Sequence, residues 1–122
     1  MRVFVKIENG SEFVGIELDA IELLELKFEC EFTCEPRLKS SNGEMYAIGL
    51  IRVLCLDGMR IARRKLSMQG GLRIDISGIA GVLEKSNEVG VCHVTGLAIA
   101  KALGKNELSL VAAIPDWAVA KT

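Results

Sequence analysis

The chain of 122 residues is poor in several residue types, and each shortage excludes a class of protein. It has two prolines and 50% hydrophobic residues, which is not the composition of a disordered segment. Its six aromatic residues offer no stacking platform for single-stranded nucleic acid. No apolar run approaches the ~20 residues that span a bilayer, and the first residues lack the apolar core of a signal peptide. We therefore expect one soluble, cytoplasmic domain over residues 1–122, without a membrane partner.

Residues suited to catalysis or metal binding are equally scarce. The chain has one histidine, His93, and four cysteines with no Cys-x-x-Cys unit. A zinc site needs convergent Cys or His ligands, and a catalytic cysteine needs a base. Cys92 precedes His93 directly, so on a strand the two side chains would point to opposite faces. Enzyme activity stays an open question and is not the leading interpretation. We expect no metal or cofactor, and we expect buried free thiols rather than disulfides.

The clearest structural pattern lies between residues 24 and 35. Six apolar residues alternate there with six polar ones, and the apolar set is Leu24, Leu26, Phe28, Cys30, Phe32 and Cys34. Successive side chains of a strand point to opposite faces, so the alternation predicts a long strand. One face of this strand is apolar, and the other is acidic through Glu25, Glu29 and Glu31.

Turn signals divide the rest of the chain into short apolar runs. Asn9-Gly10 and Asp57-Gly58 are two-residue hairpin signals. Further strands are predicted over residues 2–8, 12–18, 44–56, 59–66, 72–76, 89–94 and 108–114. Short helices are predicted over 77–85 and 96–103, the second ending at Gly104. The fold class is then α+β, mainly antiparallel sheet in a sandwich or barrel-like form, with one or two short helices in the last third. An all-β fold is the alternative.

Charge is unevenly distributed along the chain. Residues 1–35 carry nine acids and three bases, whereas residues 36–73 carry eight bases and two acids. The net charge of −1 therefore conceals an acidic segment followed by a basic one. Either the two segments pair within one sheet, or they lie on different surfaces and attract a charged partner.

The leading functional interpretation is a non-enzymatic interaction or assembly protein that forms a homo-oligomer. The mean hydropathy of +0.33 indicates apolar surface available for contacts. Arg60, Arg63, Arg64 and Lys65 are called here the basic run. The candidate interface residues come from the acidic strand and from this basic run; they are Glu25, Glu29, Glu31, Arg63 and Lys65. Nucleic acid is not the expected partner, because the domain is not basic overall.

The alternative is a domain that binds a nucleotide or another small anionic ligand. If strands 72–76, 89–94 and 108–114 were parallel, their carboxyl ends would meet at one edge of the sheet, beside two helix N-termini. The candidate ligand residues come from these strand ends and from two arginines of the basic run; they are Arg60, Arg64, Asp75, Ser77, His93 and Thr95.

One short pattern resembles a known family. Arg60-x-x-x-Arg64 followed by Asp75-Ile76-Ser77 is similar to the two-part signature of PilZ domains, β-barrels that bind cyclic di-GMP. The resemblance implies that Arg60 and Arg64 contact guanine and phosphate, while Asp75 and Ser77 complete the site. The chain departs from the signature, since Ala80 stands where the family has glycine and the gap between the two parts is short. It does not identify the chain as a member.

Overall fold

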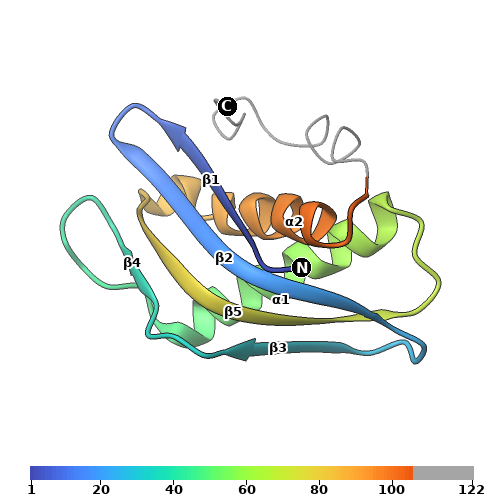
Figure 1. The fold of residues 1–122 in the computed structure, drawn as a ribbon. Helices are drawn as coiled ribbons and strands as arrows, with labels where there is room; N and C mark the ends of the chain where they lie inside the picture. The colour runs from blue at the N-terminus through green and yellow to red at the C-terminus, as the bar shows by residue number, and fades with distance from the viewer. Residues whose placement is uncertain (106–122) are drawn as a thin grey trace.

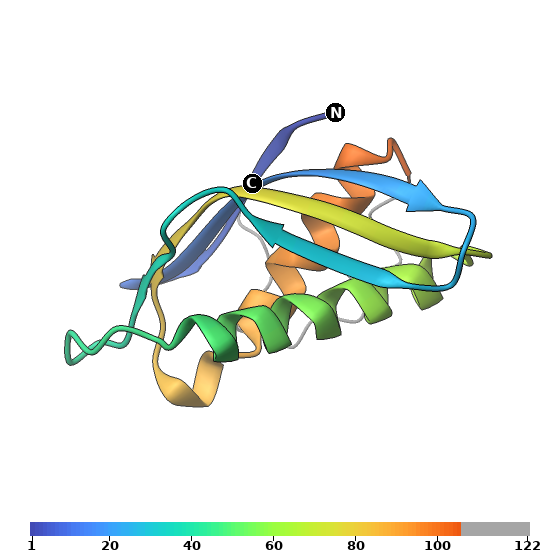
Figure 2. The same ribbon diagram turned by 90° about the horizontal axis from the view of Figure 1, so that it is seen from below.

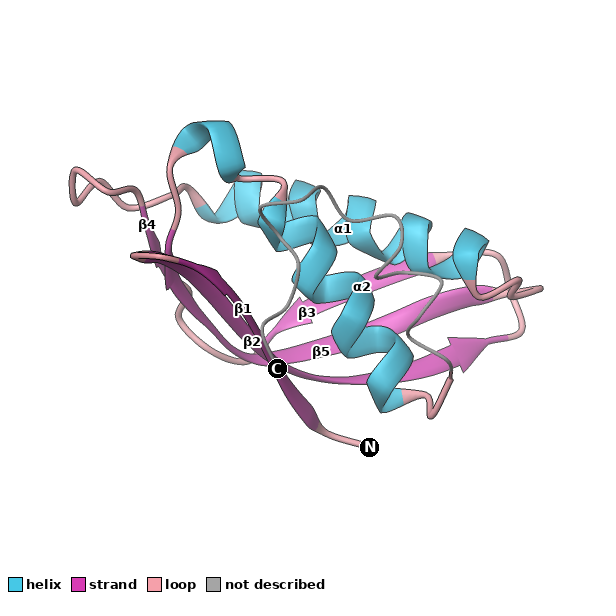
Figure 3. Ribbon diagram, turned by 90° about the horizontal axis from the view of Figure 1, so that it is seen from above, coloured by secondary structure: helices cyan, strands magenta, loops and turns pink. Residues whose placement is uncertain are grey.

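The structure is a computed structural model that describes residues 1–105. A mixed sheet of five strands lies against two helices, so the α+β class is confirmed (Figure 1). The sheet is open rather than closed into a barrel. Both helices lie on the same side of the sheet (Figure 3), so within residues 1–105 one face of the sheet is covered by helices and the other is not.

The elements follow one another in a simple order. They are β1 (Val3–Asn9), β2 (Glu12–Leu23), β3 (Phe28–Phe32), β4 (Arg37–Lys39), α1 (Ile48–Lys65), β5 (Gly71–Val82), the 3-10 turn η1 (Lys85–Asn87) and α2 (Gly90–Ala102). Neither helix of this described part is long and apolar enough to cross a membrane.

The sheet has β5 at its centre. The strand order is β1-β2-β5-β3, and β4 continues the β3 edge along the second half of β5. The β1-β2-β5 pairs are antiparallel, whereas β3 and β4 run parallel to β5. The hairpin predicted at Asn9-Gly10 is confirmed, with Gly10 at φ +63° as the first central residue of the turn.

The covered face of the sheet is aliphatic. Ile16 and Leu18 of β2 and Leu72, Ile74 and Ile76 of β5 are completely buried there. α1 packs over β3 and β5, while α2 packs over β1 and β2. Because side chains alternate along a strand, the intervening residues of β2 and β5 face away from the helices.

The two helices are in close contact at Gly58. A Cβ atom there would lie 2.6 Å from the carbonyl oxygen of Cys92 and 2.9 Å from Cβ of Thr95. The Thr95 hydroxyl donates a hydrogen bond to the Val91 carbonyl oxygen at 2.7 Å, which satisfies this buried polar group within α2. Asp57-Gly58 is therefore the middle of a helix, not a hairpin turn.

The strands predicted over 44–56 and 59–66 are wrong, because α1 occupies Ile48–Lys65. Its buried residues recur at helical spacing; they are Ile51, Leu54, Cys55, Gly58, Met59 and Ala62. Consequently a helix lies in the middle of the chain as well as in the last third.

Other boundaries also differ from prediction. The strand predicted over 89–94 is wrong, because α2 begins at Gly90 and Val89 is its N-cap. The helix predicted over 96–103 corresponds to the second half of α2, which is followed by Gly104 with φ +66°. The helix predicted over 77–85 is replaced by β5 up to Val82. The strand predicted over 24–35 is limited to β3, and residues 24–26 form a bend. The strand predicted over 108–114 lies outside the described residues.

Candidate interaction surface

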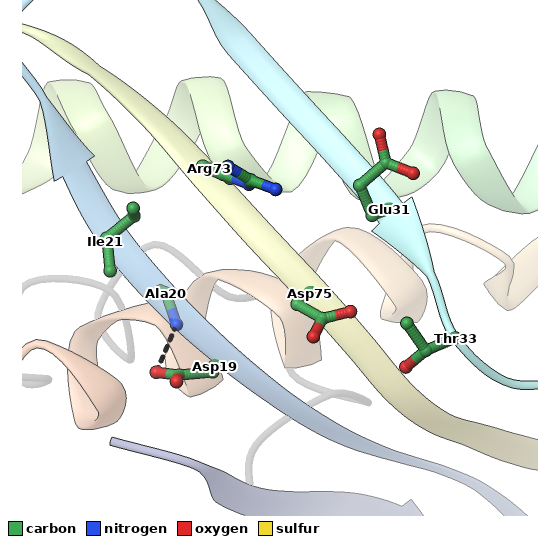
Figure 4. Close-up of a pocket in the computed structure, with 7 residues that line it drawn as sticks. All are labelled: Asp19, Ala20, Ile21, Glu31, Thr33, Arg73 and Asp75. Atoms are coloured by element: carbon green, nitrogen blue, oxygen red, sulfur yellow. Dashed lines mark hydrogen bonds between the residues drawn. The ribbon is translucent and has the colours of Figure 1, made fainter.

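The face of the sheet that lies away from the helices, called here the uncovered face, is the candidate site. Two hollows lie on it, one mainly charged and one mainly apolar. The charged hollow lies over the first half of β5 and the neighbouring parts of β2 and β3, and Figure 4 shows its side chains. The apolar hollow lies over the second half of β5 with β1 and β2.

Three carboxylates cross the charged hollow in a row. Asp19 of β2 is paired directly with Asp75 of β5, which is paired in turn with Glu31 of β3. The hollow has a volume of about 420 Å³, and its lining is completed by Ala20, Ile21, Thr33 and Arg73. Like charges at directly opposite positions destabilise a sheet. We call these three residues the acid row.

Nearby cations compensate the acid row only in part. The N-terminal ammonium lies 2.8 Å from Asp19 Oδ1, and this contact holds the pKa of Asp19 below its usual value. Arg2 Nη2 lies 3.4 Å from Asp75 Oδ2. Among residues 1–105, Glu31 has no ion pair, and Asp75 Oδ1 is buried without a hydrogen-bond partner. The row therefore keeps an excess of negative charge.

A small polar network lies beside the acid row, and its Glu17 and Ser77 also line the apolar hollow. The Ser77 hydroxyl donates to Glu17 Oε1 at 2.6 Å and accepts a hydrogen bond from Arg2 Nη1. This serine has a carboxylate, rather than a histidine or a lysine, as the acceptor of its hydroxyl proton. Its role in the described structure is to join β1, β2 and β5 on the uncovered face.

The apolar hollow contains two of the four phenylalanines. Phe4 is 57% exposed, and its ring lies so close above Gly15 that a Cβ there would be 2.9 Å from the ring. The Lys6 ammonium lies over the Phe13 ring, 5.1 Å from the ring centre. The floor comes from small residues of β5, including Ala80, and the volume is about 430 Å³. A bulky apolar side chain would fit against this surface.

The predicted interface residues separate into two groups. Glu25, Glu29 and Glu31 lie on or beside β3, whereas Arg63 and Lys65 lie at the end of α1. α1 covers the opposite face of the sheet, so this basic run does not pair with Glu31. Glu29 is neutralised instead by Lys27 at 3.1 Å and by Arg73 at 3.7 Å. The acidic strand and the basic run are thus on different surfaces of the molecule.

The predicted ligand residues do not form one site. Arg60 and Arg64 are exposed on α1, Asp75 and Ser77 lie on the uncovered face, and Thr95 is completely buried in α2. His93 is half-buried in α2, where burial lowers its pKa. The predicted convergence of parallel strand ends is wrong, since residues 90–94 belong to α2 and form no strand. An open sheet with these residues on three surfaces also does not match the PilZ expectation.

The cysteines are free, as predicted. Cys30, Cys55 and Cys92 are buried, while Cys34 is half-buried. Burial raises the pKa of Cys92 to about 11, so this thiol is not a nucleophile at neutral pH. Contact with the thiol of Cys30, together with burial, raises the pKa of Cys55. Among residues 1–105, no three His, Cys, Asp or Glu side chains are arranged to hold a metal ion.

Sequence reasoning missed several residues of the uncovered face. Asp19, Arg2 and Phe4 are brought to Asp75 and Gly15 only by the register of β1, β2 and β5. The alternation of residues 12–18 indicates which side chains share a face, but it does not indicate which strand lies beside β2. Fold and surface together define a two-layer α+β domain with an uncovered sheet face. No protein family, curated protein or solved structure was found to match the chain.

Proposed function

We propose that the chain is a non-enzymatic interaction domain that assembles with further copies of itself through the uncovered face of its sheet. The observation that carries the proposal is the pairing of two features on that face. It has hollows bordered by exposed apolar side chains, with Phe4 57% and Ile21 50% exposed. It also has an acid row that the described part of the chain neutralises incompletely.

Each feature favours a contact with another protein surface. Burying Phe4 and Ile21 would contribute roughly 25 cal/mol for each Å² of apolar surface removed from water. Cations from a partner would relieve the repulsion between the carboxylates and would guide the approach of the two molecules. The described surface offers no complete set of catalytic groups, so binding is the activity that it supports best.

The alternative, a small-ligand site built from Arg60, Arg64, Asp75, Ser77, His93 and Thr95, has no single location in the fold. Arg60 already contacts Asp57 at 3.1 Å and lies over the Phe28 ring at 5.7 Å. No observation favours it as a second candidate function.

Analytical ultracentrifugation across protein concentration and salt tests the proposal. We expect association that strengthens with concentration and weakens with salt, because exposed charges are screened beyond ~8–10 Å at physiological ionic strength. Ala80→Arg, at an exposed position of the apolar hollow, should reduce association at least tenfold. Ser41→Arg is the matched control, since Ser41 is exposed in a loop away from the sheet face. A chain that stays monomeric at every concentration, or an Ala80→Arg variant that associates normally, would refute the proposal.

A further inference from the structure

We infer that the second copy covers the uncovered face with the outer surface of its α1 helix, so that copies stack head to tail. This inference rests on the proposed self-association and adds which surface the partner contributes. The two surfaces lie on opposite sides of one molecule, the helices on one side of the sheet and the acid row on the other (Figures 1 and 3). One copy can therefore bind two neighbours.

The outer surface of α1 is unusually apolar for a helix side that faces solvent. Val53 is 53% exposed and Leu50 is 36% exposed on this side, and Ile48, the first residue of the helix, is 52% exposed. Arg60 and Arg64 follow Val53 on the same side of the helix, at spacings of seven and eleven residues. Asp57, four residues after Val53, lies between Val53 and Arg60 and pairs with Arg60 at 3.1 Å. The first half of this surface thus carries apolar side chains, and the second half keeps Arg64 as a cation without an ion pair among residues 1–105.

The uncovered face has a matching division along the same axis. The acid row lies over the first half of β5, and the apolar hollow lies over its second half. α1 runs antiparallel to β5: the Tyr46 hydroxyl, before α1, donates to the Leu83 carbonyl at 2.7 Å, and Arg63 Nε, near its end, donates to the Gly70 carbonyl at 2.7 Å (Figure 2). The basic end of α1 and the acid row are therefore at the same end of the molecule.

Stacking a second copy in the same orientation brings complementary surfaces together. Its Arg64 would lie over Asp75, and its Val53 would lie over Ala80. The spacings agree, because eleven helical residues from Val53 to Arg64 rise ~16 Å and five strand residues from Asp75 to Ala80 extend ~16 Å. Arg64 and Lys65 have no acidic partner among residues 1–105, so they are available for the contact.

A two-fold contact between two uncovered faces is less favourable. Depending on the direction of the axis, it would place the acid row of one copy against the acid row or against the apolar hollow of the other. Set against another acid row, the carboxylates lose hydration and repel one another. Set against the apolar hollow, they meet Lys6 as the cation of the lining, and Lys6 is already paired with Glu8 at 3.2 Å. The head-to-tail contact is heterologous, and it yields open stacks unless the rotation between copies closes a ring.

Charge-reversed variants test the inference. The helix variant is Arg64→Glu with Lys65→Glu, and the sheet variant is Glu31→Lys, which breaks no ion pair of the described residues. Glu44→Lys, at an exposed position of the loop between β4 and α1, is the control. We expect the wild type and the control to form species larger than dimers, and each variant alone to stay monomeric. An equimolar mixture of the two variants should associate again, because the intact α1 of the sheet variant meets the intact acid row of the helix variant, and the two sets of reversed charges attract each other.

Each outcome can be assigned by sedimentation velocity, with circular dichroism to show that every variant is folded. If the sheet variant is monomeric but the helix variant forms a closed dimer like the wild type, the contact is sheet to sheet. That result overturns the head-to-tail inference while the proposed self-association stands. If the mixture stays monomeric, the inference is also overturned. A wild-type chain that is monomeric throughout would refute both proposals.

Discussion

The two faces of the sheet differ sharply although the same strands build them. Along β5, Ile74 and Ile76 point into the core and are completely buried, while Arg73, Asp75 and Ser77 point to the other side. The covered face therefore accounts for folding stability, since it removes large aliphatic side chains from water. The uncovered face keeps charges and exposed phenylalanine that folding does not require. This contrast makes it possible to separate stability from association residue by residue.

The largest effect is expected from the covered face. Ile74→Ala removes a completely buried side chain and leaves a cavity, so it should lower the free energy of unfolding by about 2–5 kcal/mol. Arg73→Ala, at the preceding residue of the same strand, should change the free energy of unfolding by less than about 1 kcal/mol, because the ion pair of Arg73 with Glu29 is exposed. Urea denaturation measures both values. Equal losses for the two variants would contradict the assignment of the faces.

The second largest effect is expected between the helices that cover the sheet. Gly58→Ala places a Cβ 2.6 Å from the Cys92 carbonyl oxygen, so the helices must separate, at a cost of about 1–3 kcal/mol. Gly49→Ala is the matched control on the same helix, since a Cβ there meets nothing within 4 Å. The control should instead stabilise the protein by about 0.5–1 kcal/mol through helix propensity. Thermal and urea unfolding of the pair would reveal opposite signs.

The only histidine gives the covered side a pH dependence. Burial lowers the pKa of His93 in the folded chain, so between that lowered value and about 6.5 the unfolded chain binds more protons. Stability should therefore be complete above about pH 6.5 and should decrease as the pH falls through this window. The effect should be smaller than those of Ile74 and Gly58. Urea midpoints at pH 7.5 and 5.5 measure it, and His93→Gln should flatten the difference; a slope that persists in the variant would assign it to other groups.

The sequence predicted the covered face better than the helices above it. Alternation correctly indicated strands within β2 and β5, because one side of each is buried. α1 was missed because its first half is apolar on its outer surface too, as Val53 shows, and this removes the polar stripe that marks a helix. α2 was missed in part because eleven of its thirteen residues are buried, so it lacks a polar side altogether.

The candidate site was predicted only in part, because its residues come together through register. Asp75 and Glu31 were each identified, one as a ligand residue and one as an interface residue, but their direct pairing depends on β3 lying parallel to β5. A parallel pair requires a crossover through α1. Because two strands were predicted in place of α1, nothing in the sequence indicated that β3 lies beside β5. The bend at Leu24 likewise ended the long predicted strand, because the chain turns there to reach the parallel edge.

The smallest effect comes from the uncovered face, and its sign is opposite to that of Ile74→Ala. Glu31→Gln removes one of three neighbouring carboxylates and breaks no ion pair of the described residues, so it should stabilise the monomer by about 0.2–1 kcal/mol. Glu44→Gln, in an exposed loop, is the control and should have no effect. Urea denaturation in low salt detects the gain, and added salt should reduce it because repulsion is screened. If Glu31→Gln destabilises the monomer, the acid row is balanced within one chain and does not need a partner's cations. If it stabilises the monomer while weakening association, the row is retained at a cost to folding because it serves the contact between copies.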